Sequence, residues 1–251
     1  MLKFLGRGAG FSDEHNGACF GLGNKLILMD CPLVTFKRLK NEGPEKFAGC
    51  DKVEEMVAVI THTHSDHIGG LALTIHFARF IWKIKVTVIA PSELVKENLA
   101  YMLENLDGCS KETYRLVTAE EYISEFEPGE CWLKAAILTT HVPELEGKCF
   151  GYNLTVGGKN IIYTGDSNTL EPFIPYMDEG SELYTECSAF DTGVHMYVDR
   201  LLEYRQFFED KNIQVYLMHL DDAAQIENKT KNTGFKLAPL AGEGGKQNET
   251  F

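Results

Sequence analysis

The sequence predicts an α/β fold in which two β-sheets lie between outer layers of helices, a four-layer αββα sandwich. Each half of the chain opens with strand patterns, and each continues with helix and strand patterns in alternation. The chain has 251 residues, 44% of them hydrophobic and 24% charged, which is typical of a globular domain. We predict one domain over residues 1–240 and a loose, glycine-rich tail over 241–251.

The first half begins with a predicted hairpin. Two apolar segments, 18–22 and 25–29, flank Gly23-Asn24, which is a two-residue turn signal. The run over 57–60 is continuously apolar, as expected of a strand buried on both faces. The elements predicted after it are a helix over 71–83, a strand over 86–89 and an amphipathic helix over 93–106 with Ser92 as its N-cap.

The second half repeats this style. Large apolar side chains alternate with small or polar ones over 150–156, which predicts a half-buried strand. Gly157-Gly158 then turns the chain into a second strand. The elements predicted from there on are a strand over 161–163, a helix over 197–210 and a strand over 215–218.

Charge and cysteine content narrow the function classes. The net charge of −13, with 37 acids against 24 bases, argues against gripping long nucleic acids, which requires many lysine and arginine contacts to phosphate. No apolar run approaches the roughly 18 residues that cross a bilayer, and the start lacks a signal peptide. The seven cysteines form no Cys-x-x-Cys pair, which indicates reduced thiols in a cytoplasmic protein.

The strongest chemical signal is a histidine cluster directly after the apolar run over 57–60. His62, His64, Asp66 and His67 fall within six residues. Imidazole nitrogens and carboxylate oxygens are the usual ligands of catalytic zinc. A solvated loop or a hydrogen-bonded core histidine could account for one of these residues, but not for three histidines and an aspartate together. The cluster therefore predicts a metal site.

Three further candidate ligands follow downstream: His141, Asp166 and His219. Each comes after an apolar segment that is predicted as a strand, and strand ends are where α/β proteins place their site residues. Taken singly, each could be an ordinary polar residue at a strand end. Their combination with the histidine cluster favours metal ligands.

With these motifs in this order, the chain resembles the metallo-β-lactamase fold, and within it the ribonuclease Z-like and phosphodiesterase branch. The motifs that carry the resemblance span most of the chain: Phe4-Leu5-Gly6-Arg7-Gly8-Ala9-Gly10, Leu26-Ile27-Leu28-Met29-Asp30-Cys31, the His62 cluster, His141 with Gly151-Tyr152, Tyr163-Thr164-Gly165-Asp166, Glu186-Cys187-Ser188 and Met218-His219.

The resemblance implies a dinuclear metal centre. The first ion would be bound by His62, His64 and His141, and the second by Asp66, His67 and His219, with Asp166 bridging the two. Zinc is the default for such ligands, and manganese and iron are compatible with them. Two divalent ions can share a hydroxide and clamp the attacking and leaving oxygens of a substrate, so the expected activity is hydrolysis.

The resemblance also points to candidate catalytic residues, namely Asp66, His195 and Glu186. In ribonuclease Z-like enzymes a histidine placed like His195 assists the leaving group and is paired with an acid. The match is imperfect, because Tyr197 stands where the family usually has a small hydroxyl residue. The structural alternatives are a helix-start histidine with one hydrogen bond and an ordinary strand-end glutamate.

The substrate class stays open between two hydrolytic alternatives. Ribonuclease Z proper carries a long basic arm for tRNA, whereas residues 94–127 here hold a helix pattern and acidic residues. We therefore expect a small molecule, a nucleotide or another phosphodiester. The alternative is an acyl hydrolase of the lactonase, thioesterase or glyoxalase II kind, because the same ions polarise a carbonyl.

A non-hydrolytic di-iron relative or a binding module is disfavoured. The di-iron proteins typically have an acid where this chain has His64, and a degenerate binding module would have lost ligands that are all present here. A homodimer is compatible with the family, although no residue pattern indicates an interface.

Overall fold

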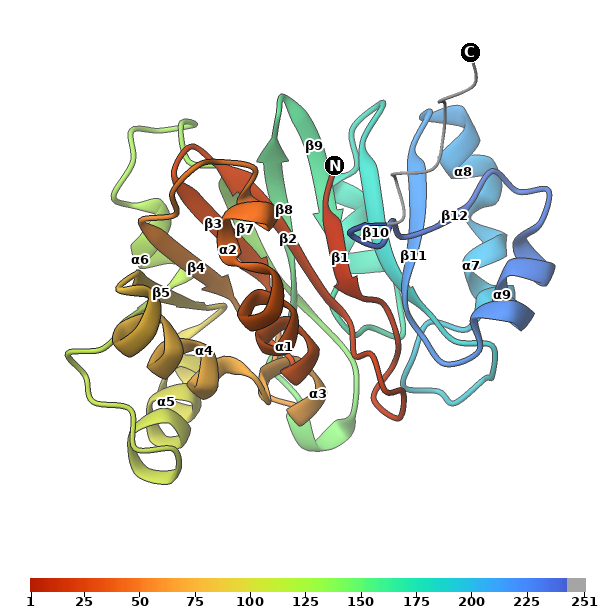
Figure 1. Cartoon of the computed structure of the whole chain (residues 1–251). Coiled ribbons are helices and arrows are strands. Elements are labelled where there is room, and N and C mark those ends of the chain that lie inside the picture. Colours follow the sequence, from red (N-terminus) through yellow and green to blue (C-terminus); the bar gives the residue numbers. More distant parts are fainter. Residues whose placement is uncertain (243–251) are drawn as a thin grey trace, which may run out of the picture.

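Two six-stranded sheets form the frame of the computed structural model, which describes residues 1–242 (Figure 1). The strands of the first sheet, in spatial order, are β1 (Lys3–Gly6), β2 (Gly17–Leu22), β3 (Lys25–Met29), β4 (Glu55–Val59), β5 (Lys85–Ala90) and β6 (Arg115–Thr118). Those of the second sheet, in spatial order, are β12 (Lys236–Leu237), β11 (Gln214–Leu220), β10 (Glu182–Cys187), β9 (Lys159–Tyr163), β8 (Cys149–Val156) and β7 (Leu133–Thr139).

The two sheets share one plan. In each, the first three strands of the chain pair antiparallel and the later strands pair parallel. The helices of the first half are α1 (Leu33–Glu42), α2 (Pro44–Ala48), α3 (Ser65–Ile68), α4 (Leu71–Phe77), α5 (Glu93–Tyr101) and α6 (Ala119–Ile123), with π-helical segments η1 (Ala78–Trp82) and η2 (Met102–Leu106). Those of the second half are α7 (Val198–Glu203), α8 (Arg205–Asp210) and α9 (Ala223–Thr230), with 3₁₀ segments η3 (Pro143–Leu145) and η4 (Glu171–Tyr176).

Three hydrophobic clusters fill the spaces between four layers. One lies between the first sheet and its helices, the second between the two sheets, and the third between the second sheet and α7 to α9. Strand β4 shows how one strand serves two clusters. Met56 and Ala58 belong to the helix side and Val57 and Val59 to the inter-sheet side, because successive side chains of a strand point to opposite faces. The predicted αββα sandwich is confirmed.

Several predicted elements are subdivided in the structure. The helix predicted over 71–83 is α4 continued by η1, and that over 93–106 is α5 continued by η2. Ser92 caps α5 as predicted, its side chain accepting a hydrogen bond from the Val95 amide. The helix predicted over 197–210 is two helices, α7 and α8, separated by a turn at Tyr204 (φ −83°, ψ −1°).

Strand β8 differs from its prediction in burial. Alternation over 150–156 predicted one solvated face, yet the strand is buried from Cys149 to Leu154. The second face is covered by η4: a Cβ added at Gly151 would lie 2.5 Å from the ring of Phe173. The small residue in the alternating pattern, Gly151, is therefore where η4 packs closely on the strand, and not a position exposed to water.

The remaining expectations concern the cysteines, membranes and the tail. All seven cysteines are free thiols and all but Cys50 are buried. Within residues 1–242, no helix is long and apolar enough to cross a bilayer. Of the tail predicted over 241–251, residues 243–251 lie outside the described part of the chain.

Candidate metal centre

The first half of the chain contributes its candidate ligands from one loop and one helical turn. His62 and His64 lie in the loop that follows β4, and Asp66 and His67 lie in α3. Gly69 and Gly70 follow α3, and neither has a positive φ. Their role is close approach: a Cβ at Gly70 would lie 2.3 Å from the Pro32 carbonyl oxygen.

The second half contributes its candidate ligands from three separated strand ends. His141 follows β7, Asp166 follows β9, and His219 is the penultimate residue of β11 with φ of 50°. Gly165, directly before Asp166, has φ of 59°, and a Cβ there would lie 2.7 Å from the Phe150 carbonyl oxygen. Glycine is required at this turn for both reasons.

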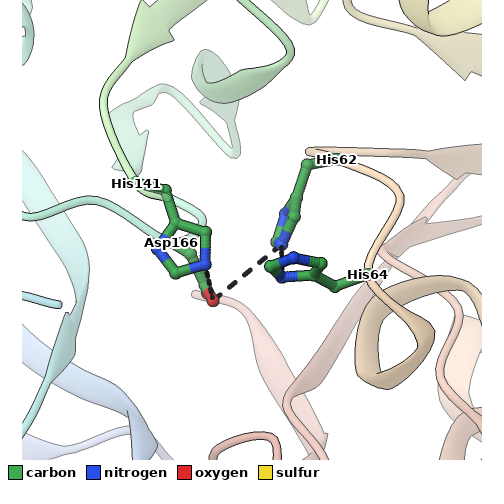
Figure 2. A group of neighbouring side chains, drawn as sticks. All are labelled: His62, His64, His141 and Asp166. Carbon is green, nitrogen blue, oxygen red and sulfur yellow. Dashed lines mark hydrogen bonds and ion pairs between the residues drawn. The ribbon is translucent and has the colours of Figure 1, made fainter. Parts of the chain in front are cut away.

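Four of these side chains form a first group and point toward one another (Figure 2). His62 Nε2 lies 3.1 Å from His64 Nδ1 and 3.9 Å from Asp166 Oδ2. His141 Nε2 lies 3.6 Å from the same Asp166 oxygen. The ligand atoms of the group all lie within 4.8 Å of one another.

Asp166 also belongs to a second group, with Asp66, His67 and His219. His67 Nε2 lies 3.3 Å from Asp166 Oδ1 and 3.4 Å from Asp66 Oδ2. His219 Nε2 lies 3.2 Å from Asp66 Oδ2 and 3.4 Å from Asp166 Oδ2. Every predicted ligand is thus in one of two groups, and Asp166 joins them.

The donor set fits divalent metal ions. His67 Nε2 and Asp166 Oδ1 are buried 3.3 Å apart, and within residues 1–242 neither makes a hydrogen bond of normal geometry. Such atoms cost free energy unless a ligand or ion satisfies them. Nitrogen and carboxylate donors are the ligands that zinc prefers. Two adjacent ions sharing Asp166 would satisfy the orphaned atoms of both groups.

The outer ring nitrogens of two first-group histidines are held by the protein. The Thr61 hydroxyl lies 3.0 Å from His62 Nδ1. His141 Nδ1 donates to the Val194 carbonyl over 2.8 Å. Fixing one ring nitrogen in this way orients the other toward an ion.

A third histidine ring is held by Asp30, a residue for which the sequence indicated no role beyond a place in a matching motif. Asp30 is completely buried, and its carboxylate accepts hydrogen bonds from His67 Nδ1 (2.9 Å) and from the Thr61 amide (2.8 Å). Its φ of 58° is one that aspartate tolerates better than most residues. An aspartate at the end of an apolar strand was the available signal, but its partner lies 37 residues away.

Burial and charge set the protonation of the histidines. Burial, together with the charge of His67, holds the pKa of His62 well below its usual value, and burial also lowers that of His64 and His141. The three histidines of the first group are therefore neutral and free to bind an ion. Burial opposes protonation of His67 as well, but Asp166 and Asp30 outweigh it and hold the pKa of His67 well above its usual value. The second group thus attracts positive charge.

His195 and Glu186 lie against the centre. Glu186 is completely buried in β10, and its Oε2 accepts a hydrogen bond from His195 Nδ1 over 2.5 Å. The His195 ring centroid lies 4.8 Å from that of His141 and 5.4 Å from that of His219. Burial opposes protonation, but the Glu186 hydrogen bond raises the pKa of His195 to about 9. The side chain is 25% exposed, so a protonated imidazole borders the ligand cluster and solvent.

Comparisons with known proteins identify relatives that match nearly the whole chain. The family model described as "Anti-Pycsar protein Apyc1" matches residues 1–238. The chain is 28% identical over 237 residues to the anti-Pycsar protein Apyc1 of Bacillus phage 010DV004, covering 88% of this chain and 89% of that protein.

Solved structures show the same fold at low identity. The metallo-β-lactamase fold protein YhfI from Bacillus subtilis has a TM-score of 0.69 and 18% identity, covering 96% of this chain and 97% of that one. A diphosphatase from the PhnP family has a TM-score of 0.65 and 17% identity, covering 96% and 95%. The resemblance to the metallo-β-lactamase fold is confirmed.

Proposed function

The chain belongs to the family of the anti-Pycsar protein Apyc1, and on this premise we propose that it is a metal-dependent hydrolase of a small phosphodiester. The observation that carries the proposal is the pair of ligand groups joined by Asp166. The phage relative is named as an anti-Pycsar protein, and we extend that role to this chain, exerted through this centre. Substitution of Asp166 should abolish this anti-Pycsar role in cells that contain Pycsar.

The residues would divide as the sequence resemblance implied. The first ion would be held by His62, His64 and His141, the second by Asp66, His67 and His219, with Asp166 between them. Zinc is the default for these donors, with manganese or iron as alternatives. When bound, the ions supply Lewis acidity and a water of lowered pKa at neutral pH.

The chain's own residues would handle the leaving group. Glu186 fixes His195 through its Nδ1, and a pKa of about 9 keeps that imidazole protonated at neutral pH. We assign His195 as the general acid that protonates the departing oxygen, and Glu186 as its positioning residue. Asp66 stays a candidate catalytic residue, because it is the more exposed carboxylate of the centre (13%, against 2% for Asp166) and contacts His67 and His219.

Charge supports a small substrate. The net charge of −13 would repel an extended polyanion, whereas metal ions offset the charge locally and can bind one phosphoryl group. A phosphorus substrate is supported further by the structural neighbour named as a diphosphatase.

The test is hydrolysis of bis(p-nitrophenyl) phosphate by protein loaded in turn with Zn²⁺, Mn²⁺ and Fe²⁺. Turnover is expected in the wild type and should fall at least about 100-fold in Asp166→Ala, because that variant loses a ligand of both groups. The exposed Asp51→Ala is the matched control. No turnover from protein that holds two ions per chain would overturn the phosphodiester proposal and direct the search to lactones and thioesters.

The general-acid role has its own signature. His195→Gln should slow cleavage of a dinucleotide, whose leaving alkoxide needs a proton, by about 100-fold or more. Cleavage of bis(p-nitrophenyl) phosphate should fall much less, because p-nitrophenolate leaves without protonation. Equal losses on both substrates, at unchanged metal content, would mean that His195 does not act as the acid.

A further inference from the structure

The loop between β1 and β2 presents an aromatic side chain with no packing partner. Phe11 has a relative exposure of 111%, so within the described residues its ring is fully in water. The loop itself is held in place. The Gly8 amide donates to the Glu14 carbonyl over 2.8 Å, and the Ala9 amide donates to the Leu220 carbonyl over 3.0 Å.

These contacts fix the loop beside the metal centre. Leu220 directly follows the candidate ligand His219 in β11. A Cβ added at Gly10 would lie 3.1 Å from Asp66 Oδ2. Since consecutive Cα atoms are about 3.8 Å apart, Phe11 begins about one residue length from that contact. Figure 1 shows the β1–β2 loop and α3 at the same edge of the molecule.

The position of Phe11 gives no structural reason for a large apolar residue. Exposing an aromatic ring forgoes the free energy that burial would provide, and its neighbours Gly10 and Ser12 leave the loop without other apolar cover. A ring beside a phosphodiester centre meets the part of the substrate that extends away from the metals. In a nucleotide that part is a flat base, and any base can stack on an aromatic ring.

We propose that Phe11 is a substrate-binding residue that stacks on the nucleobase of a small nucleotide substrate. The inference rests on the proposed function, because a base is placed there only if its phosphate occupies the metal centre. A contact between two copies of the chain fits less well. Asp13 and Glu14 are exposed in the same loop, and a two-fold interface built on it would bring like charges together.

The test uses tryptophan as a stacking reporter. In Phe11→Trp, the emission of the new tryptophan is obtained by subtracting the wild-type fluorescence. Titration of the metal-loaded protein with the four nucleoside 5′-monophosphates should quench this emission. Inorganic phosphate, which has no base, should leave it unchanged. The matched control is Phe80→Trp, since Phe80 is 60% exposed in η1, near the start of β5 and away from the ligand loops.

A second variant measures the effect on catalysis. Phe11→Ala should raise KM for nucleotide diesters roughly 5- to 100-fold, the range that corresponds to loss of one stacked base, with kcat within about 3-fold. Its thermal stability should equal that of the wild type, because the ring packs on nothing.

The outcomes separate the two proposals. Quenching by nucleotides without any diester hydrolysis would sustain the role of Phe11 and overturn the proposed activity. Hydrolysis with neither quenching nor a KM change would overturn the role of Phe11 alone. A change of molecular mass by light scattering in Phe11→Ala would also overturn it, in favour of a contact between copies.

Discussion

The two halves of the molecule build one metal centre in opposite ways. The first half supplies His62, His64, Asp66 and His67 from six consecutive residues. The second supplies His141, Asp166 and His219 from three strand ends spread over 79 residue numbers. Both sheets follow the same antiparallel-then-parallel plan, so the difference lies in how the ligands are held and not in the frame.

The local ligands are held by Thr61 and Asp30 of the same half, whereas the dispersed ligands need contacts between loops. In the second half, Asn168 provides them. Its side-chain Nδ2 donates to the Gly193 carbonyl over 2.9 Å, and its side-chain Oδ1 accepts from the Thr140 hydroxyl over 2.6 Å. Its backbone N–H donates to the Thr140 carbonyl over 3.0 Å. One residue thus ties together the loops that carry His141, Asp166 and His195.

The largest expected effect concerns Asp166, the residue through which the second half governs both ligand groups. In Asp166→Ala, we expect protein purified in the presence of zinc to hold close to no zinc. In His64→Ala, from the first half, the second group stays intact, so about one zinc per chain should remain. Elemental mass spectrometry on the folded proteins measures both, with circular dichroism as the check on folding. Equal zinc content in the two variants would contradict the sharing of Asp166.

The next effect concerns Asp30, which supports the local half. In Asp30→Asn, the carboxylate that accepts from His67 Nδ1 and Thr61 is lost at a buried site, while asparagine still tolerates the positive φ. Removing one partner of a buried charged network lowers the free energy of unfolding by about 3 kcal/mol. Zinc affinity should fall by about 10- to 100-fold, as for other residues that orient a metal ligand.

Urea denaturation and competition with a chelator measure these two quantities. The exposed Asp51→Asn should change the unfolding free energy by less than about 0.5 kcal/mol. An Asp30→Asn variant with wild-type zinc affinity would show that the local loop holds His67 without it.

A smaller effect is expected from Asn168→Ala, which removes the side-chain hydrogen bonds to Gly193 and Thr140 in the second half of the chain. Hydrolysis of bis(p-nitrophenyl) phosphate should fall about 10-fold, because His141 and Asp166 lose the contact that aligns their loops. The matched control is Asn105→Ala, since Asn105 makes one exposed hydrogen bond, to the Tyr101 carbonyl. If the two variants behave alike, the second half does not depend on Asn168.

The same contrast explains what could be predicted from the sequence. The αββα layers and the seven candidate ligands that the structure brings together could be named from the sequence, because residue types and strand patterns are local properties of the chain. Asn168 and the carbonyl of Val194 were missed, because their partners, the Gly193 carbonyl and the His141 ring, lie in loops distant in the chain. Asp30 was missed for the same reason, since nothing in the sequence pairs it with His67.

Helix continuity was predicted less well than the centre. The break at Tyr204 between α7 and α8 lies inside a continuous helical pattern, and the Tyr204 hydroxyl donates to Glu171, 33 residues earlier. The burial of β8 likewise depends on η4, which follows it in the chain and has no strong sequence pattern. Tertiary contacts determine both the break at Tyr204 and the burial of β8, and the periodicity of the sequence carries no information about such contacts.

The smallest expected effect concerns Glu42, a surface residue outside the metal centre. Glu42 in α1 pairs with Arg38 (2.8 Å) and Lys46 (2.7 Å). The Arg38 hydrogen bond, more than that of Lys46, lowers the pKa of Glu42 from 4.5 to about 2. Because the pKa is lower in the folded state, the ion pairs stabilise the protein above about pH 4.5, and this contribution is lost as the pH falls toward 2.

The pairs lie at the surface, so Glu42→Gln should lower the free energy of unfolding by less than about 1 kcal/mol at pH 7. The difference from wild type should shrink through pH 4.5 and vanish near pH 2, as urea denaturation across that range would measure. Zinc content and turnover at pH 7 should not change, since α1 contributes no ligand. A loss of zinc in this variant would mean that general destabilisation also empties the centre, and the effects of Asp30→Asn and Asn168→Ala could then no longer be assigned to their contacts with the ligand loops.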